Sequence, residues 1–243
     1  MTMKKSTPAG QSAPPRDAYH HGALRETLID ATETLLAERG VEGFSLREVA
    51  RRSGVSPAAP AHHFGDAYGL LAVVATQAFD QLTKALDAGN VRGGNDPVAR
   101  LREQGVGYVG FAMTHPGRFG LMFRSGLQKN ETLVTSADAA FNRLECGVRA
   151  LLEISNDAPL DPAQWQTLLL IWSVVHGFAQ LSLSGQIEQV AASGNRNDML
   201  RQVLAPMLDR QLRGLQQLGG KPRTRIRASA SKVKSSRVAA RTR

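Results

Sequence analysis

The chain has 243 residues, of which 42% are hydrophobic and 21% charged, and its net charge is +9. A chain of this length and composition forms one large domain or two small ones, and it is neither a collagen, a disulfide scaffold nor a fully disordered protein. Its one cysteine, Cys146, excludes an internal disulfide and a cysteine-based zinc site, and we expect it to be a packed thiol.

The first part of the chain, residues 1–18, is predicted to be a flexible arm because it is rich in proline, glycine and small polar residues. A first helix is predicted over residues 23–39, where apolar side chains recur on one face at helical spacing. Gly40 is placed to end this helix, since glycine readily adopts the left-handed conformation that closes many helices.

Two short helices are predicted next. Ser45 and Glu48 have the spacing of a capping box, in which the serine hydroxyl and the glutamate side chain each bond a backbone amide at the start of the helix. Ser56 followed by Pro57 has the pattern of an N-cap and a first helical residue, and this helix is expected to run as far as His63.

The three helices within residues 23–64, with the last two joined by about three residues around Gly54, indicate a helix-turn-helix unit. In such a unit the second helix of the pair enters the major groove of double-stranded DNA. An ordinary three-helix subdomain without a role in DNA binding has the same spacing, so the pattern alone leaves both interpretations open.

The chain from Asp66 to residue 219 is predicted to consist of helices and loops, and the fold class is therefore all-α. The alternation of apolar and polar residues that marks a strand is absent. A loop is expected over residues 89–95 from its glycines and asparagines, and Pro206 is expected to kink the last helix. The predicted helices cover residues 68–86, 97–115, 118–123, 131–154, 162–183 and 199–219.

The net charge is concentrated in residues 221–243, which hold nine basic residues and no acidic one. The helix-turn-helix region is slightly acidic, with five Lys or Arg against seven Asp or Glu between residues 19 and 66. We expect the tail to be disordered. It is interpreted either as a non-specific arm for nucleic acid, whose cations displace counterions from phosphates, or as a solubilising extension.

Several short motifs make the chain similar to the TetR family of transcriptional regulators. In the first part they are Ala37-Glu38-Arg39-Gly40, Ser45-Leu46-Arg47-Glu48-Val49-Ala50, Gly54-Val55-Ser56, His63-Phe64 and Leu70-Leu71. In the second part, Trp172-Ser173-Val174-Val175-His176-Gly177 and His115-Pro116 resemble a TetR subfamily with a Trp-His-Gly signature. The sequence departs from the family at Ala61 and Ala67, where a tyrosine and a lysine usually contact phosphates, and Pro60 removes a backbone donor from the recognition helix.

This resemblance implies a homodimer, formed by the last two long helices as a four-helix bundle, that binds a near-palindromic operator on double-stranded DNA. It also implies that a small-molecule effector of unknown identity releases the operator, so that the protein is a ligand-responsive repressor. The expected domains are the arm at 1–18, the helix-turn-helix domain at 19–66, the effector-binding and dimerisation domain at 67–220 and the basic tail at 221–243.

The candidate functional residues form two groups. The DNA-binding candidates are Ser45, Arg47, Ser56, Pro57, Ala58, Ala59, Ala61, His62 and His63. The ligand-binding candidates are Tyr108, Phe111, Met122, Phe123, Trp172 and His176. The second group lies on largely apolar helices, so each of its members is also interpreted as an ordinary core residue.

Other classes of protein have less support in the sequence. No catalytic motif is present, and neither a cofactor nor a metal is expected, because the adjacent His62 and His63 point about 100° apart on a helix. A non-specific DNA-binding protein driven by the tail, and a helical ligand carrier or enzyme, stay open as alternatives. Residues 1–20 lack a secretory signal, and the longest apolar run, Leu168–Trp172, is too short to span a membrane, so we expect a cytoplasmic protein.

Overall fold

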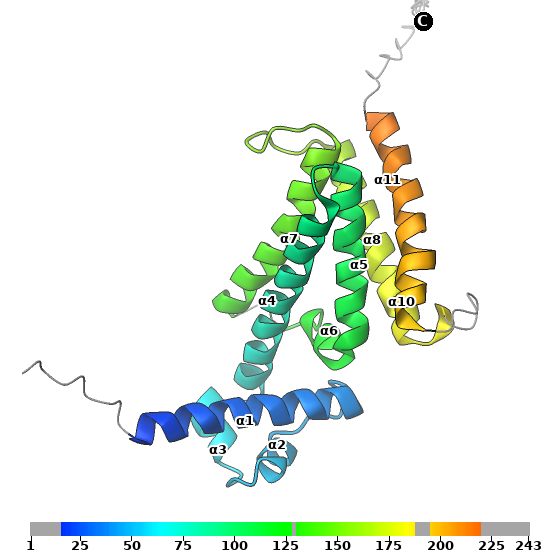
Figure 1. The fold of residues 1–243 in the computed structure, drawn as a ribbon. Coiled ribbons are helices and arrows are strands. Elements are labelled where there is room, and N and C mark those ends of the chain that lie inside the picture. The colour runs from blue at the N-terminus through cyan, green and yellow to red at the C-terminus, as the bar shows by residue number, and fades with distance from the viewer. Residues whose placement is uncertain (1–15, 128–129, 188–194, 220–243) are drawn as a thin grey trace, which may run out of the picture.

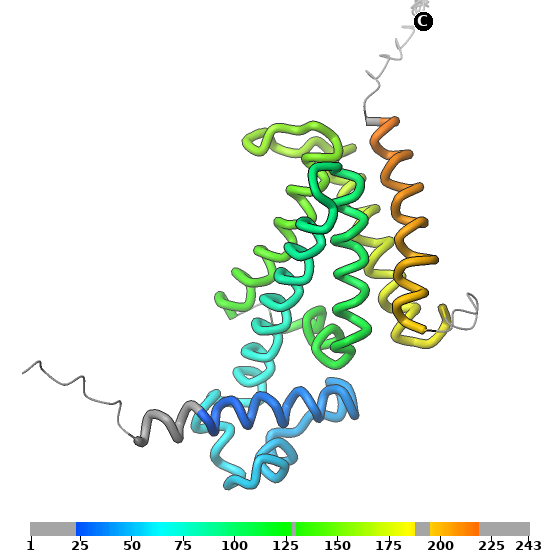
Figure 2. The backbone as a smooth tube through the Cα atoms, viewed as in Figure 1, coloured from blue at the N-terminus to red at the C-terminus, as the bar shows by residue number. Residues whose placement is uncertain are grey.

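The computed structural model describes residues 16–127, 130–187 and 195–219, and within these ranges it is helical without a strand (Figures 1 and 2). The predicted all-α fold is therefore confirmed. The elements are α1 (Arg16–Arg39), α2 (Leu46–Arg52), α3 (Ala59–Phe64), α4 (Ala67–Gly93), α5 (Pro97–Thr114), α6 (Pro116–Met122), α7 (Glu131–Leu151), α8 (Pro162–Leu183), α10 (Arg196–Asp198), a π-helical segment (Met199–Leu204) and α11 (Ala205–Gly219).

Helices α1, α2 and α3 form a small head at one end of the molecule (Figure 1). Its core contains Leu28, Leu35 and Val49, which are fully buried. The Gly40 N–H donates to the Leu36 carbonyl at 2.9 Å with φ +66°, which confirms the predicted end of the first helix. The helix begins earlier than predicted, at Arg16, so the last three residues of the expected arm are helical, whereas residues 1–15 lie outside the described part.

The body is a bundle in which α4 packs against α5 and α7, and α5 packs against α8 and α11. Helix α4 starts in the head and runs through the body (Figure 1). Its start is set by Asp66, whose side chain accepts a hydrogen bond from the Gly69 N–H at 2.8 Å, as the sequence predicts. Asp161 likewise caps α8 with a full capping box closed by Gln164, so the predicted start of that helix is confirmed.

Helix α6 joins the body to the head. Its Gly117 lies so close to α1 that a Cβ atom there would be 2.6 Å from the backbone carbon of Leu36. Its Arg118 pairs with Glu33 of α1 and donates a hydrogen bond to Gln81 of α4. The head is thus held to the body by a close backbone contact and by an arginine that bridges three helices.

The loop between α2 and α3 is longer than predicted. It spans residues 53–58, and α3 starts at Ala59 with Pro60 in its first turn, whereas the sequence predicted a start at Pro57. The Ala59 N–H bonds the Ser56 carbonyl at 3.0 Å, so Ser56 and Pro57 belong to a turn before the helix. Because the first N–H groups of a helix have no intrahelical partner, Pro60 disrupts no helical bond there.

The loop predicted over residues 89–95 is mostly helix. Helix α4 continues to Gly93, and only Gly94, with φ +61°, has the left-handed conformation of a turn. A Cβ on Gly89 would lie 2.7 Å from the Glu103 carbonyl oxygen, and one on Gly93 would lie 2.4 Å from the Cα of Arg100. These glycines therefore allow α4 and α5 to approach closely, and do not break the helix.

Three smaller predictions differ from the structure. Helix α7 ends at Leu151, three residues before the predicted Ile154. Near Pro206, where a kink was expected, a π-helical segment (Met199–Leu204) leads directly into α11. Cys146 is exposed on α7 and is not the packed thiol that was expected, because it lies on the helix face turned away from the body core.

Candidate DNA-binding head and ligand cavity

The candidate DNA-binding residues lie together on the outer surface of the head, in α2, α3 and the turn between them. Ala59 and His63 are half-buried, whereas the other candidates are exposed. Pro60 is buried against the head, so it fixes α3 from behind while the neighbouring side chains face solvent. The exposed candidates are Ser45, Arg47, Ser56, Pro57, Ala58, Ala61 and His62.

The start of α2 is fixed in a different way from the one predicted. Ser45 occupies the N-cap position in an extended conformation, but its side chain makes no capping hydrogen bond, so the predicted capping box is wrong. Glu48 instead accepts hydrogen bonds from Arg51 at 2.7 and 2.8 Å and from Arg52 at 3.0 Å. Arg52 also bonds Glu38 of α1 at 2.6 Å, and this chain of charges ties α2 to α1.

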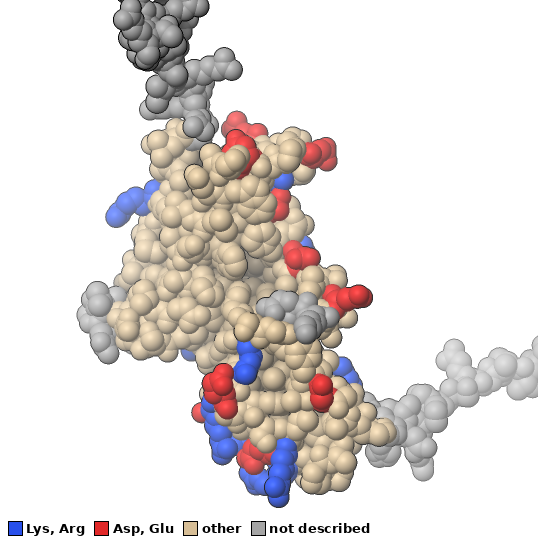
Figure 3. Space-filling model, turned by 180° about the vertical axis from the view of Figure 1, so that it is seen from behind, with Lys and Arg blue, Asp and Glu red and all other residues tan. Residues whose placement is uncertain are grey.

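These ion pairs decide how much positive charge the head offers to DNA. The hydrogen bonds from Arg51 and Arg52 lower the pKa of Glu48 to about 2, so its carboxylate stays ionised and balances the two arginines. Arg47 is exposed and takes part in none of the ion pairs found among the described residues. Figure 3 shows basic and acidic side chains next to each other over the head. The folded head is therefore a weakly charged surface on which Arg47 is a cation that no acidic side chain of the described residues balances.

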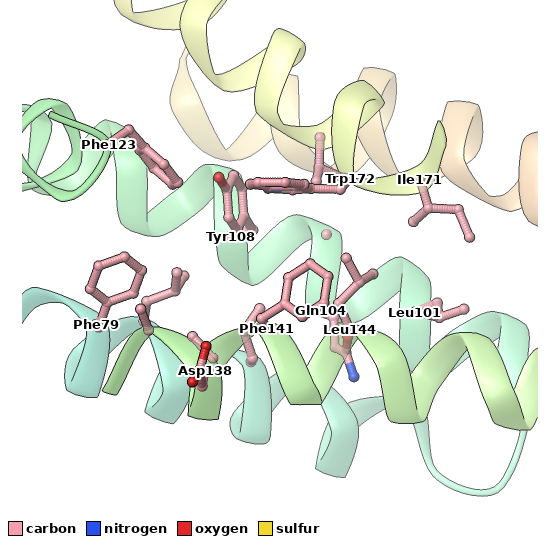
Figure 4. A pocket seen from close by; sticks show the side chains of 16 residues that line it. Phe79, Leu101, Gln104, Tyr108, Phe123, Asp138, Phe141, Leu144, Ile171 and Trp172 are labelled. Carbon is pink, nitrogen blue, oxygen red and sulfur yellow. The ribbon is translucent and has the colours of Figure 1, made fainter. Parts of the chain in front are cut away.

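A cavity of about 260 Å³ lies in the body between α4, α5, α7 and α8 (Figure 4). Its lining is mainly apolar, and it includes rings from four helices and from the residue after α6. The aromatic lining residues are Phe79, Tyr108, Phe123, Phe141 and Trp172, and the polar ones are Gln104 and Asp138. A mostly apolar cavity with few polar groups is typical of a small-molecule site.

The cavity brings together three of the predicted ligand-binding residues, Tyr108, Phe123 and Trp172. His176 lies behind this wall, where its Nδ1 atom is 2.8 Å from the Tyr108 hydroxyl and its ring centroid is 4.7 Å from that of Phe123.

The two other candidates lie outside the lining of this cavity. Phe111 is buried next to His115, with 5.2 Å between the ring centroids, and it lines a different surface hollow between α4 and α5. Met122 is buried in the core at the end of α6. Sequence periodicity identified both as inward-facing residues, but it could not tell which inward-facing residues border an empty volume.

The sequence reasoning missed four of the residues that give the cavity its character: Phe79, Phe141, Gln104 and Asp138. Phe79 and Phe141 follow the apolar stripes of α4 and α7, so their helix faces could be predicted. Their position at a cavity depends on the spacing of four helices, and no local pattern in the sequence encodes that spacing.

Burial keeps the side chains of Tyr108, in the lining, and His176, behind it, uncharged. It raises the pKa of the Tyr108 hydroxyl, which the hydrogen bond from the Trp172 indole opposes only in part. Burial also lowers the pKa of His176. At neutral pH the phenol and the imidazole are therefore both uncharged, and they form a neutral hydrogen-bonded pair. Within the described ranges, no group of three His, Cys, Asp or Glu residues could hold a metal ion.

Comparison with known protein families identifies the family to which this chain belongs. A family model described as "Bacterial regulatory proteins, tetR family" matches residues 28–74, and one described as "Tetracyclin repressor-like, C-terminal domain" matches residues 101–207. The chain belongs to the TetR family. This TetR-family protein thus has the family's two parts in the expected order, and the family consists of transcriptional regulators.

Individual relatives are distant. The transcriptional regulator BetI of Burkholderia cenocepacia is 37% identical over 78 residues, which are 32% of this chain and 40% of BetI. A protein of unknown function from Rhodococcus sp. RHA1 has 30% identity and a TM-score of 0.60, over 79% of this chain and 97% of that one. RolR, solved with resorcinol, has 20% identity and a TM-score of 0.51, over 84% and 97% of the two chains, and shows the same fold.

Proposed function

We propose that this TetR-family protein is a repressor that binds operator DNA as a homodimer and releases it when a small molecule fills the cavity. The observation that carries the proposal is the course of α4. This helix begins directly after the predicted recognition helix α3, and its residues Phe79, Leu82 and Leu86 form one wall of the cavity. A ligand that changes the cavity therefore acts on the helix from which the head projects.

The proposed DNA contacts follow from the geometry of the head. Helix α3 and the turn before it present small exposed side chains and His62, while Pro60 and Phe64 face the head. Small side chains allow the backbone of α3 to approach the bases in the major groove, and Arg47 on α2 is placed to contact a phosphate. We take residues 19–66 as the DNA-binding domain and residues 67–220 as the effector-binding and dimerisation domain.

The proposed dimer explains an apolar surface on α8. Trp165, Leu169, Leu170 and Leu181 are between 42 and 46% exposed. By length and composition α8 could also cross a membrane. Its other face, however, packs against α5 and α7 in the body, which is the arrangement of a core helix. A second copy would cover the exposed face through a four-helix bundle of α8 and α11, which lie on the same side of the body (Figure 1).

The proposed response to a ligand is a linkage between two binding equilibria. The dimer has a form whose heads match the operator and a form whose heads do not. An effector that binds more tightly to the second form lowers the DNA affinity, and the size of the effect is set by the ratio of its affinities for the two forms. The RolR structure supports this role for the cavity, because a protein of the same fold holds a small organic molecule. Acting on DNA, the protein would work in the cytoplasm.

The test is to recover the DNA fragments that the purified protein retains from sheared genomic DNA, and to footprint the enriched sequences. A discrete protected site with near-palindromic half-sites is expected. Retention of DNA without any enriched sequence, at every salt concentration, would show a non-specific DNA-binding protein instead. Release of the footprint by a compound that also quenches the tryptophan fluorescence would link the operator to the cavity.

A further inference from the structure

The lining of the cavity carries a negative charge and no positive charge. Its lining contains one charged side chain, the exposed Asp138 carboxylate on α7, and contains no Lys, Arg or His. The ion pairs of α7 are made by Arg143 with Asp87 and by Arg149 with Glu145, and they leave Asp138 out. His176 behind the wall is uncharged at neutral pH because burial lowers its pKa. An occupant of the cavity therefore meets a negative field with no cation in the lining to offset it.

The aromatic rings of the lining face the same space. Figure 4 shows Tyr108, Phe123 and Trp172 on one side of the cavity, opposite Phe79 and Phe141 on the other. Phe141 and Trp172, with centroids 5.9 Å apart, and Phe79 and Phe123, with centroids 6.3 Å apart, each form an edge-to-face pair at the border of the cavity. The face of an aromatic ring carries partial negative charge, so it attracts a cation placed within about 6 Å and disfavours an anion.

Gln104 adds a hydrogen-bond acceptor. This side chain is 4% exposed, and its Nε2 atom donates to Asn90 Oδ1 at 2.6 Å and to the Arg143 carbonyl at 3.3 Å. Because both partners are acceptors, the orientation of the amide is determined. Its Oε1 atom accepts no hydrogen bond from the described residues, and it is the polar atom left for an occupant of the cavity that Gln104 lines. An acceptor in the lining of a cavity favours an occupant that supplies an N–H group.

From the single carboxylate, the aromatic lining and the acceptor of Gln104, we infer that the cavity selects a compact organic cation, an amine on an apolar body. This inference names the class of effector for the site and so rests on the proposed function. The ammonium group would lie toward Asp138, and the apolar body would occupy the cavity among the aromatic rings of the lining. Carboxylic acids of the same shape are disfavoured by the same carboxylate.

The test uses three probes with one body and different end groups: 3-phenylpropylamine, 3-phenylpropan-1-ol and 3-phenylpropanoate. Each is titrated into the full-length protein at pH 7 in a calorimeter. The amine is expected to bind at least about fivefold more tightly than the alcohol, because an ion pair and ring contacts of the ammonium group are each worth up to about this factor. The propanoate is expected to bind most weakly of the three.

Two isosteric substitutions distinguish the charge of Asp138 from a non-specific effect of removing one negative charge. Asp138→Asn is expected to weaken binding of the amine by about threefold to fivefold and to leave the alcohol unchanged, since the loss is that of one exposed ion pair. The control is Asp80→Asn, which removes the same charge from an exposed position of α4 outside the lining. It is expected to leave the affinities for all three probes unchanged.

The outcomes also separate this inference from the proposed function. Equal or tighter binding of the alcohol or the propanoate overturns the inference, as does the absence of binding by all three probes or an Asp138→Asn variant that binds the amine normally. Gel shifts with the operator are measured in parallel. Selective binding of the amine without release of DNA supports the inference and contradicts the ligand response. Release of DNA by anions or neutral compounds alone supports the proposed ligand response and contradicts the inference that the effector is a cation.

Discussion

The head carries ion pairs at its surface, where Arg52 bridges Glu38 and Glu48, whereas the cavity in the body is lined mainly by apolar and aromatic side chains. The two regions therefore respond to different variables. Surface ion pairs and phosphate contacts depend on salt. Packing of a ligand against the apolar walls of a cavity selects by shape, and this contribution is much less sensitive to the ionic strength of the solvent. Salt dependence should thus separate substitutions in the head from substitutions in the body.

The largest expected effect comes from separating the two copies. Leu169→Glu places a charge on the exposed apolar face of α8 and should leave the protein folded but monomeric in sedimentation. Without the second half-site, operator affinity should fall by about 100-fold or more, because the second head of a dimer binds in effect intramolecularly. A monomer that retains full affinity would show that each head binds DNA alone. Glu131→Gln, at an exposed position of α7, serves as the control for a change of charge.

The next prediction contrasts one residue from each region. His176→Ala removes the partner of Tyr108 and should weaken binding of the effector by about tenfold, the equivalent of one hydrogen bond to a group that is then left unsatisfied. Operator affinity without effector should not change. Arg47→Ala should do the opposite, with weaker DNA binding, a flatter salt dependence and normal binding of the effector. If either variant loses both operator binding and effector binding, the head and the cavity do not function independently.

Local signals in the sequence located the parts of both regions that depend on neighbouring residues alone. Gly40, Asp66 and Asp161 act as predicted, because a helix end is decided by the conformation and hydrogen bonds of a few adjacent residues. The start of α3 was misplaced because Pro57 and Pro60 are both compatible with a first turn. The loop expected at residues 89–95 was wrong because glycine marks close helix packing as well as turns.

The candidate site was predictable only in part, for a physical reason. The exposed surface of α2 and α3 that we propose contacts DNA could be predicted from the helix order, and its role in binding stays a prediction. Three cavity residues were found, but Phe111 and Met122 were included and Phe79 and Phe141 were missed. An apolar stripe shows which face of a helix is turned inward, and it has the same form whether that face meets other side chains or an empty volume.

A smaller effect is expected from residues 221–243, which lie outside the described part of the chain. We expect their removal to weaken binding to the operator and to a scrambled duplex by a similar factor, since phosphate contacts carry no sequence information. The slope of log affinity against log salt should flatten by about 0.9 for each phosphate that the shortened chain no longer neutralises. Equal slopes for the two proteins would end the idea of a DNA-binding arm. A weaker affinity for the operator alone would indicate that the tail takes part in sequence recognition.

The smallest expected effects compare the N-caps of the two regions directly. Asp161 accepts hydrogen bonds from the Ala163 and Gln164 N–H groups at 2.8 and 2.9 Å, whereas the Ser45 side chain makes no capping bond. Asp161→Ala should therefore lower the free energy of unfolding by about 0.5–2 kcal/mol. Ser45→Ala should change it by less than about 0.5 kcal/mol, as for an ordinary surface position. Thermal unfolding of both variants measures the difference.

DNA affinity, measured on the same two variants, shows what Ser45 does if it is not a cap. Ser45 is exposed at the start of α2, where its hydroxyl can donate to a phosphate oxygen, so Ser45→Ala should weaken operator binding by a few-fold with no loss of stability. Asp161→Ala should leave operator binding unchanged below its melting temperature. If Ser45→Ala instead lowers the melting temperature as much as Asp161→Ala does, Ser45 caps α2 in solution.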